Sequence, residues 1–132
     1  MSKGDRSMEL HKGGKEYLKT ILVLEQQSDV VRSLDVSKAL HVTKPSVSKA
    51  MKRLRERGYL TMDADKQIHL TQTGRTIAEQ NIEKHRLLMA CPISMGVDPA
   101  AAERDASGME HAISSETLAQ MKLFVDTKGR LL

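Results

Sequence analysis

The stretch SGMEHAIS, Ser107–Ser114, places a carboxylic acid and an imidazole side by side at Glu110 and His111. On a helix, Glu103 and Ser107 would lie on the same stripe as this pair. Oxygen ligands and an imidazole on one face can bind a divalent cation when neighbouring elements complete the coordination shell. The spacing alone therefore leaves two interpretations open, a metal site or a solvated acid–histidine border beside the packed face.

Two residues from other segments are candidates to complete such a shell, Glu16 and His85, because each lies in a stretch with helical apolar spacing. An apolar stripe of small and medium side chains runs beside the polar stripe. We expect this stripe, with two apolar residues of the last helix, to form the centre of a homodimer. The residues expected at that interface are Ala102, Ala106, Met109, Ile113, Leu118 and Met121.

A second group of residues is strongly basic. Residues 44–57 hold six basic side chains and one acidic one, a net charge of +5, whereas residues 98–126 carry a net charge of −4. Apolar residues at helical spacing leave Lys, Arg and Ser on the opposite face, which could enter a DNA major groove; the alternative is a solvated surface helix. The candidate DNA-binding residues are Ser33, Lys44, Pro45, Ser46, Ser48, Lys49, Lys52, Arg53 and Lys66.

Turn and capping signals predict the elements that must position these residues. The order helix, helix, helix, hairpin is that of a winged helix-turn-helix, with Lys66 at the tip of a small β-hairpin wing. Two or three further helices would form a separate layer, and Pro92 should end or kink the first of them near Cys91. The expected helices cover residues 15–27, 34–41 with Ser33 as cap, 44–57, 72–91 with Thr71 as cap, 100–113 and 116–125, and the expected strands are YLTM and QIHLT.

Composition restricts the class of protein. The chain has 132 residues, of which 39% are hydrophobic and only 2% aromatic, so the core must be aliphatic and mainly α-helical. No apolar run approaches the roughly 20 residues of a membrane span, and the N-terminus lacks a secretory signal. A single cysteine, Cys91, excludes an internal disulfide. We expect a cytoplasmic protein without membrane association, with a DNA-binding domain at 1–74 and a helical metal-binding and dimerisation domain at 75–132.

Four stretches together resemble the diphtheria-toxin-repressor and manganese-transport-regulator family of metal-dependent transcription factors. They are GKEYLKTILVLE, KPSVSKAMKRL, LTQTGRTIA followed by EKHRLL, and GVDPAAAERDASGMEHAIS. The resemblance implies an N-terminal winged helix, a C-terminal helical dimerisation domain and repression of metal-uptake genes in response to Mn(II) or Fe(II). Carried over by position, it implies a metal site made by Glu16, His85, Glu110 and His111. The polar stripe described above adds Glu103 and Ser107 as possible further ligands.

This sequence departs from the family pattern at several of these positions. Ser107 stands where iron-type members have Cys and manganese-type members have Glu. Lys19 and Met89 stand where relatives have acids, and Cys91-Pro92 falls where relatives have bulky apolar residues on an unbroken helix. The loss of three potential ligands implies one metal ion per subunit rather than two.

The sequence therefore predicts a metal-dependent transcriptional regulator that binds a double-stranded DNA operator as a homodimer. One alternative is a winged-helix regulator of the same family whose metal site has degenerated, controlled by another ligand or by none. A more distant alternative is a small metalloenzyme in which a His/Glu site activates water. No HExxH motif, nucleophile elbow or phosphate-binding loop supports the enzyme, and it would leave the basic helix unexplained.

Overall fold

The computed structural model describes residues 13–131, with side chains as far as Thr127. The chain forms two compact units, Met1–Asn81 and Ile82–Leu132, each considered by itself below. The first twelve residues of the expected DNA-binding domain lie outside the described range. The division after Asn81 falls within a long helix, whereas the predicted domain boundary after residue 74 falls near its start; that boundary stays a prediction.

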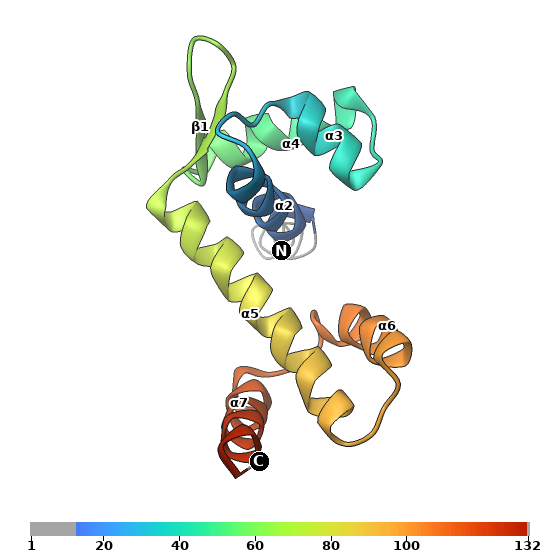
Figure 1. Ribbon diagram of the computed structural model, residues 1–132. Helices are drawn as coiled ribbons and strands as arrows, with labels where there is room; N and C mark the ends of the chain where they lie inside the picture. Colours follow the sequence, from blue (N-terminus) through green and yellow to red (C-terminus); the bar gives the residue numbers. More distant parts are fainter. Residues whose placement is uncertain (1–12, 132) are drawn as a thin grey trace, which may run out of the picture. The chain divides into compact units, whose positions relative to one another are not determined.

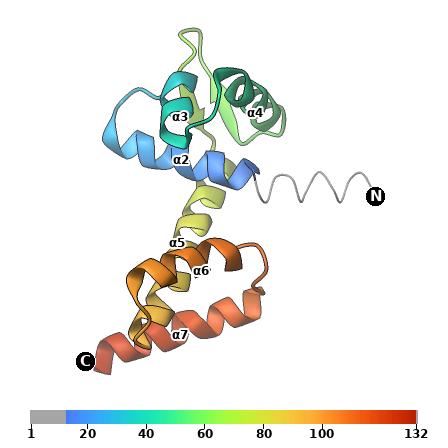
Figure 2. The same cartoon turned by 90° about the vertical axis from the view of Figure 1, so that its right-hand side faces the viewer.

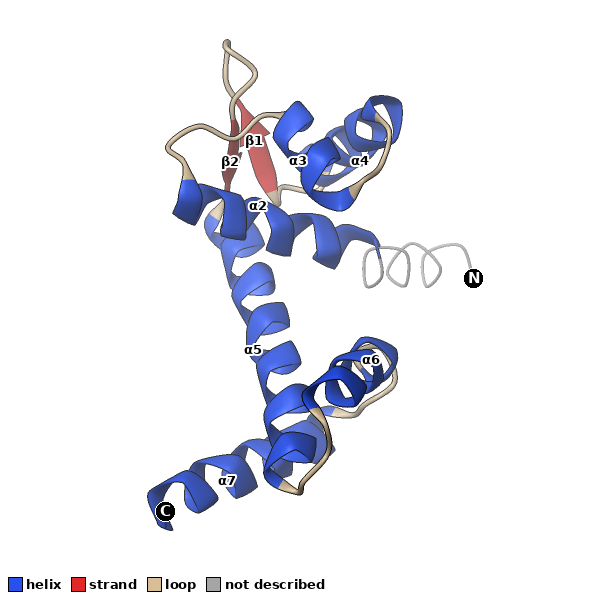
Figure 3. Cartoon of the chain, turned by 45° about the vertical axis from the view of Figure 1, so that its right-hand side comes forward, coloured by secondary structure: helices blue, strands red, loops and turns tan. Residues whose placement is uncertain are grey.

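The described residues of the first unit form three helices and a hairpin, in the order that the sequence predicts, followed by the start of α5, Gln72–Ser94 (Figure 1). Its apolar core is aliphatic, with Leu18, Val47, Met51 and Leu60 each at most 1% exposed. The two strands pair antiparallel in the register Leu60↔Leu70, Thr61↔His69 and Met62↔Ile68. The elements are α2 (Lys15–Gln27), α3 (Ser33–Leu40), α4 (Lys44–Glu56), β1 (Leu60–Met62) and β2 (Ile68–Leu70), drawn by type in Figure 3.

The loop before α3 forms a backbone hydrogen bond with this two-stranded sheet. The backbone N–H of Ile68 donates to the carbonyl of Val31 at 2.8 Å, so β2 has a backbone partner on each side. The N-cap of α3 is Arg32 rather than the expected Ser33, because the backbone N–H of Arg32 donates to the carboxylate of Asp35 at 2.9 Å. Ser33 is instead the first residue of the helix.

The second unit consists of helices, and α5 (Gln72–Ser94) begins in the first unit and continues into it. The other two helices are α6 (Pro99–Met109) and α7 (Ser115–Leu131), shown from another side in Figure 2. Pro92 does not end α5, which continues to Ser94; the hydroxyl of Ser94 donates to the carbonyls of Ala90 and Cys91 at 2.9 Å each. No helix in the described part of the chain is long and apolar enough to cross a membrane.

Two helix ends differ from the sequence-based expectation. The helix expected over 100–113 ends at Met109, so Glu110 is its C-cap and His111 lies in the turn that follows. The physical reason is the next helix: the hydroxyl oxygen of Ser114 accepts the N–H of Thr117 at 3.1 Å, so the chain must leave α6 before Ser114. Helix α7 then extends to Leu131, well beyond the expected end at residue 125.

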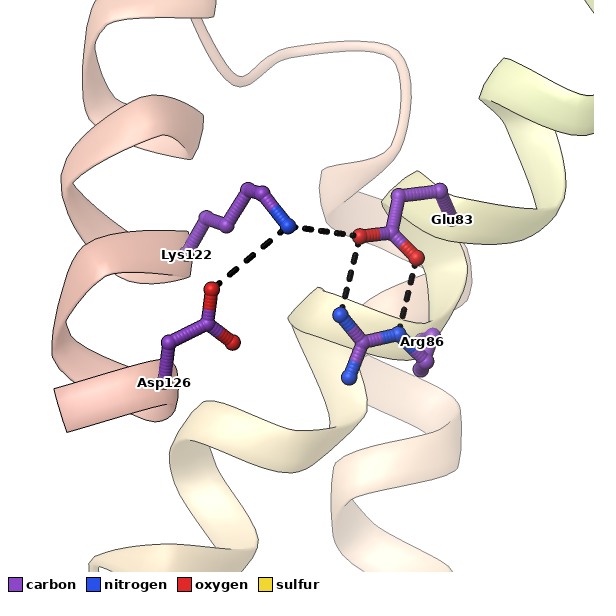
Figure 4. A network of polar contacts seen from close by, with 4 residues as sticks. All are labelled: Glu83, Arg86, Lys122 and Asp126. Atoms are coloured by element: carbon purple, nitrogen blue, oxygen red, sulfur yellow. Dashed lines mark hydrogen bonds and ion pairs between the residues drawn. The ribbon is translucent and has the colours of Figure 1, made fainter. Parts of the chain in front are cut away.

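A four-residue charge network joins α5 to α7 within the second unit (Figure 4). Arg86 donates two hydrogen bonds of 2.8 Å to the carboxylate of Glu83. Lys122 lies 3.4 Å from Glu83 and 3.5 Å from Asp126. The hydrogen bonds from Arg86, assisted by Lys122 and opposed by partial burial, lower the pKa of Glu83 to about 2. The Glu83 carboxylate, which connects α5 to α7 through Lys122, is therefore charged throughout the neutral pH range.

Because the folded-state pKa of Glu83 is depressed, its stabilising contribution should be fully present above the ordinary value of 4.5 and be lost as the pH falls towards 2. A ¹³C NMR titration of the Glu83 carboxyl carbon should give a midpoint near 2. Arg86→Ala should raise that midpoint by more than Lys122→Ala, since the Arg86 hydrogen bonds are the larger cause. A wild-type midpoint near 4.5 would contradict the network.

The start of α5 lies directly against the backbone of Tyr59. A Cβ atom added to Gly74 would sit 2.0 Å from the Tyr59 carbonyl oxygen, so only glycine fits there. The hydroxyl of Thr71 donates to the carbonyl of Gly58 at 2.7 Å and accepts the N–H of Gly74 at 3.1 Å, which confirms Thr71 as the cap of this helix. This junction joins the end of α4, the hairpin and α5.

Gly74→Ala should therefore lower the free energy of unfolding by roughly 1–3 kcal/mol or more, because the methyl group overlaps a backbone atom that cannot move alone. Urea denaturation followed by circular dichroism measures the change. The matched control is Gly108→Ala in α6, where the added Cβ would meet nothing within 4 Å. That substitution should be neutral or stabilise by up to about 1 kcal/mol. Equal losses in the two variants would refute the proposed clash.

Candidate functional site

Helix α4 presents one apolar and one polar face. Val47, Met51 and Leu54 are buried, and the basic and hydroxyl residues of the other face are exposed. Thr43 is the N-cap; its hydroxyl oxygen accepts the N–H of Ser46 at 3.3 Å, and Pro45 occupies the first turn, where its missing N–H costs nothing. The arrangement leaves a rigid, cationic helix face open to solvent.

An open groove lies between α4 and the wing, which is the hairpin of β1, its turn and β2. Of the residues predicted to bind DNA, Ser33, Lys44, Ser48, Lys52 and Lys66 line this groove. Sequence reasoning missed two further cations there, although Arg55 belongs to the basic stretch 44–57 and Arg32 directly precedes Ser33. The charged residues lining the groove are Arg32, Lys44, Lys52, Arg55 and Lys66, with Asp63 as the single acid.

Four of the predicted DNA-binding residues lie outside the groove. Pro45, Ser46 and Lys49 are exposed on α4, and Arg53 lines a separate small hollow with Tyr17 and Arg57. All four belong to α4, and they lie outside the groove because their side chains leave the helix axis in other directions. The groove thus divides the basic helix into a side facing the wing and a side facing away from it.

The wing tip is built around Asp63. One oxygen of its carboxylate accepts the N–H groups of Asp65 at 2.9 Å and Gln67 at 3.0 Å. The other lies 2.9 Å from Nε2 of His69, and this hydrogen bond is the largest cause of a lowered pKa for Asp63. Lys66 adopts a left-handed backbone conformation with φ of 62° and donates its N–H to the Asp63 carbonyl at 2.9 Å. The single acid of the groove therefore shapes the turn that carries Lys66.

The wing is also tied to the helix-turn-helix. The Nε of Arg32 donates to the carbonyl of Asp65 at 3.3 Å, and this contact joins the start of α3 to the wing tip. Together with the backbone hydrogen bond between Ile68 and Val31, it connects the wing to the loop before α3 at two positions, one in β2 and one at the wing tip. Residues 31–32 therefore hold the wing, one wall of the groove, against the start of α3.

In the second unit, His85 on α5 lies between two carboxylates. Its Nε2 is 3.0 Å from an oxygen of Glu103 on α6, and its Nδ1 is 3.6 Å from an oxygen of Glu110. The Glu110 side chain is only 10% exposed, whereas that of Glu103 is 56% exposed. Nδ1 of His85 is buried and has no hydrogen-bond partner. A buried ring nitrogen facing a buried carboxylate at a distance too long for a hydrogen bond is a notable feature, because such groups are normally paired.

The other predicted metal ligands are placed differently. Glu16, on α2, belongs to the first unit and lies 3.8 Å from the ammonium group of Lys19. His111 is exposed in the turn after α6, and the hydroxyl of Ser107 donates back to the carbonyl of Glu103 at 3.2 Å. Within residues 13–131, no group of three or more His, Cys, Asp or Glu side chains converges where a metal ion could be held.

The residues expected at the dimer interface fall into two groups by burial. Ala102 and Ala106 are 0% exposed within the single chain, so they are part of its own core and offer no surface to a partner. Met109, Ile113, Leu118 and Met121 are half-buried. Large apolar side chains that the sequence interpretation did not include are exposed on α7, namely Leu123 at 59% and Phe124 at 46%.

Comparison with protein families matches almost the whole chain. Residues 9–68 match the family described as iron dependent repressor, N-terminal DNA binding domain. Residues 71–128 match the family described as iron dependent repressor, metal binding and dimerisation domain. The transcriptional regulator MntR of Escherichia coli O6:H1 is 34% identical over 114 residues, which cover 86% of this chain and 74% of that protein. MntR of Salmonella typhimurium is 33% identical over a segment of the same length.

Solved structures show the same fold. The crystal structure of the metal-dependent transcriptional regulator MtsR superposes with a TM-score of 0.78 at 25% identity and covers 85% of this chain and 53% of its own. A manganese-dependent transcriptional repressor in complex with manganese gives a TM-score of 0.74 at 24% identity, with coverage of 85% and 52%. The chain therefore spans about half the length of these two solved proteins.

Proposed function

The chain belongs to the iron-dependent repressor family, and we propose that it is a transcriptional regulator whose affinity for operator DNA rises when a divalent metal ion binds. The observation that carries metal dependence is the buried, unpaired Nδ1 of His85 beside the carboxylate of Glu110. The family is one of transcriptional regulators, so the metalloenzyme alternative is abandoned.

The cationic groove is the surface that we propose for DNA. Lys52 and Arg55 on α4 and Lys66 on the wing line the same groove, so a duplex with its major groove on α4 would meet positive charge on both sides. Contacts to phosphates supply most of the affinity and position the protein, while Ser48 and Lys49 are suited to reach base edges. The tie between Arg32 and the wing tip keeps Lys66 in place before DNA arrives.

Replacing a groove cation should weaken binding to every DNA sequence, because a phosphate contact carries no sequence information. For Lys52→Ala, the slope of log affinity against log salt concentration should fall by about 1, the value for one lost phosphate contact. Fluorescence anisotropy with operator and unrelated duplexes measures both quantities.

The charge-matched control is Lys84→Ala, which removes a lysine of the second unit that does not line the groove. Its salt slope should equal that of the wild type. An unchanged slope in Lys52→Ala, or equal changes in the two variants, would show that the groove is not the DNA-binding surface.

The residues of the second unit fit a divalent metal ion chemically. When Nδ1 of His85 is unprotonated, it and the Glu110 oxygen are both electron-pair donors at 3.6 Å, and a cation between them would relieve their mutual repulsion. Imidazole and carboxylate ligands without a thiolate suit Mn(II) or Fe(II), the metals that we propose, at one ion per subunit. When bound, such an ion would hold the His85 and Glu110 side chains together by its charge.

The rest of the proposed ligand set is carried by the family resemblance. His111 follows Glu110 directly, and the turn after α6 leaves its ring exposed. Glu16 remains a proposed ligand on the strength of the resemblance alone, and its contact with Lys19 would compete with a metal ion for the carboxylate. Ser107 is engaged with the helix backbone, which supports a single-ion site.

Metal binding can favour DNA binding only to the extent that the DNA-competent form binds the ion more tightly than the other forms do. A coupling free energy of about 1–3 kcal/mol would change operator affinity by about 5- to 150-fold. The match to a dimerisation domain supports a homodimer, whose surface we place on Met109, Ile113, Leu118 and Met121 with the exposed Leu123 and Phe124 of α7. We also propose a cytoplasmic location, where operator DNA would be accessible.

Calorimetric titration of metal-free protein with Mn(II) should show one ion per protomer. Glu110→Gln, which keeps the shape of the side chain and removes its charge, should weaken Mn(II) binding at least tenfold and abolish the metal dependence of operator affinity. His69→Gln, at an exposed histidine of the wing, is the control and should bind Mn(II) like the wild type.

Wild-type protein that binds operator equally well with and without Mn(II) or Fe(II) would favour the alternative of a degenerate site. Two equally tight ions per protomer would contradict the single-ion proposal.

A further inference from the structure

We propose that His69 is a positioning residue of the DNA-binding wing: its hydrogen bond to Asp63 holds the turn that presents Lys66 to DNA. The inference rests on the proposed function of the cationic groove. It assigns a role to a side chain that does not itself line this groove. All the residues concerned belong to the first unit.

The backbone of Lys66 is in a conformation that glycine adopts far more readily than a residue with a side chain. Its φ of 62° lies in the left-handed region, where the Cβ atom crowds the following carbonyl oxygen. A residue keeps such a conformation only when the surrounding contacts hold it there, and such residues are frequent at functional sites. The turn of residues 63–67, DADKQ, contains no glycine. A lysine where glycine would be unstrained indicates that its ammonium group is used.

The contacts that hold this conformation converge on Asp63. Its carbonyl oxygen accepts the N–H of Lys66 at 2.9 Å. Its Oδ1 accepts the N–H groups of Asp65 at 2.9 Å and Gln67 at 3.0 Å. Its Oδ2 forms a hydrogen bond of 2.9 Å with Nε2 of His69 on β2. One carboxylate oxygen therefore shapes the turn while the other is tied to the strand, so the side chain cannot rotate without breaking a bond.

His69 is the donor in its bond to Asp63. This hydrogen bond is the largest cause of the lowered pKa of Asp63, and the N–H of Gln67 adds to it. Asp63 is therefore ionised at neutral pH, and an ionised carboxylate can only accept hydrogen bonds. His69 thus satisfies the carboxylate oxygen that the backbone of the turn does not engage.

The position of His69 leaves little room for a role in packing. Side chains alternate along β2, so Ile68 is buried whereas the His69 side chain is 52% exposed. The residue opposite His69 on β1 is Thr61, which is exposed and uncharged. The effect of replacing His69 should therefore follow the fate of its bond to Asp63 rather than a loss of core contacts.

The first experiment separates the bond from the ring. Glutamine places its amide nitrogen where Nε2 of histidine lies, whereas asparagine places its amide nitrogen near the position of Nδ1. His69→Gln should keep the pKa of Asp63 low, and His69→Asn and His69→Ala should raise it towards its ordinary value. A ¹³C NMR titration of the Asp63 carboxyl carbon measures this pKa. Thr61→Ala is the control and should leave it unchanged.

The second experiment is DNA binding, followed by fluorescence anisotropy with a duplex of random sequence, because phosphate contacts carry no sequence information. Loss of one phosphate contact lowers the salt slope by about 0.9, so the loss of affinity should be about three- to fourfold larger at about 50 mM than at about 200 mM salt. Lys66→Ala, His69→Ala and His69→Asn should all show this pattern. His69→Gln and Thr61→Ala should bind like the wild type.

Two further variants test whether His69 acts through Lys66. Adding Lys66→Ala to His69→Ala should cause little further loss of DNA affinity, because the contact is already lost. Lys66→Gly should bind DNA as weakly as Lys66→Ala but unfold at a higher urea concentration, because glycine relieves the left-handed strain. Circular dichroism should show the same helix content in every variant.

Three results would overturn the inference: wild-type DNA affinity in His69→Ala, equal losses in His69→Gln and His69→Ala, or additive losses in the double variant. Unchanged DNA affinity in Lys66→Ala, with a loss in Lys52→Ala, would also overturn it. Unchanged affinity in both lysine variants would instead overturn the proposed function of the groove. The NMR titration would still decide whether His69 holds the Asp63 carboxylate.

Discussion

Helix α5 starts against the backbone of Tyr59, and the arrangement of the first unit depends on this close approach. The Thr71 hydroxyl bonds both to the Gly58 carbonyl and to the N–H of Gly74, so the end of α4, the wing and α5 meet at one point. A side chain at position 74 would separate them, because its Cβ would overlap the Tyr59 carbonyl. The cationic groove has α4 as one wall and the wing as the other, and both elements are connected to this junction.

Most of the fold could be predicted from local signals, and the errors have local causes. The helix bounds 15–27 were predicted correctly because apolar spacing and polar flanks agree there. The helix expected over 100–113 was too long because Met109 and Ile113 continue the apolar spacing, whereas the end of α6 is decided by Ser114 capping the next helix. Pro92 was expected to end or kink its helix near Cys91; it does not end it, since α5 continues to Ser94, whose hydroxyl bonds to the carbonyls of Ala90 and Cys91, and the kink stays a prediction.

The residue types of the candidate site could be predicted from the sequence, but the contacts between its side chains could not. Spacing along one helix could group Glu103 with Glu110, yet it could not reveal that a histidine from α5 lies between them with one nitrogen toward each. The burial of Ala102 and Ala106 could not be predicted from spacing either. Their apolar stripe predicted a dimer interface, but both side chains are 0% exposed within the single chain, where their small size allows close packing. In the groove, Arg32 was missed because it lies outside the basic helix and reaches the wing tip only through the fold.

The backbone bond between Val31 and Ile68 also affects association between molecules. A projecting hairpin usually exposes strand edges, along which unpaired N–H and carbonyl groups can recruit a strand from another molecule. Here the loop before α3 pairs with β2 at Ile68, and β1 on the other side is only three residues long. A strand of that length offers too few backbone groups to seed a cross-β stack, and charged Asp63, Asp65 and Lys66 follow it directly. The wing can therefore project from the first unit with little tendency to initiate aggregation.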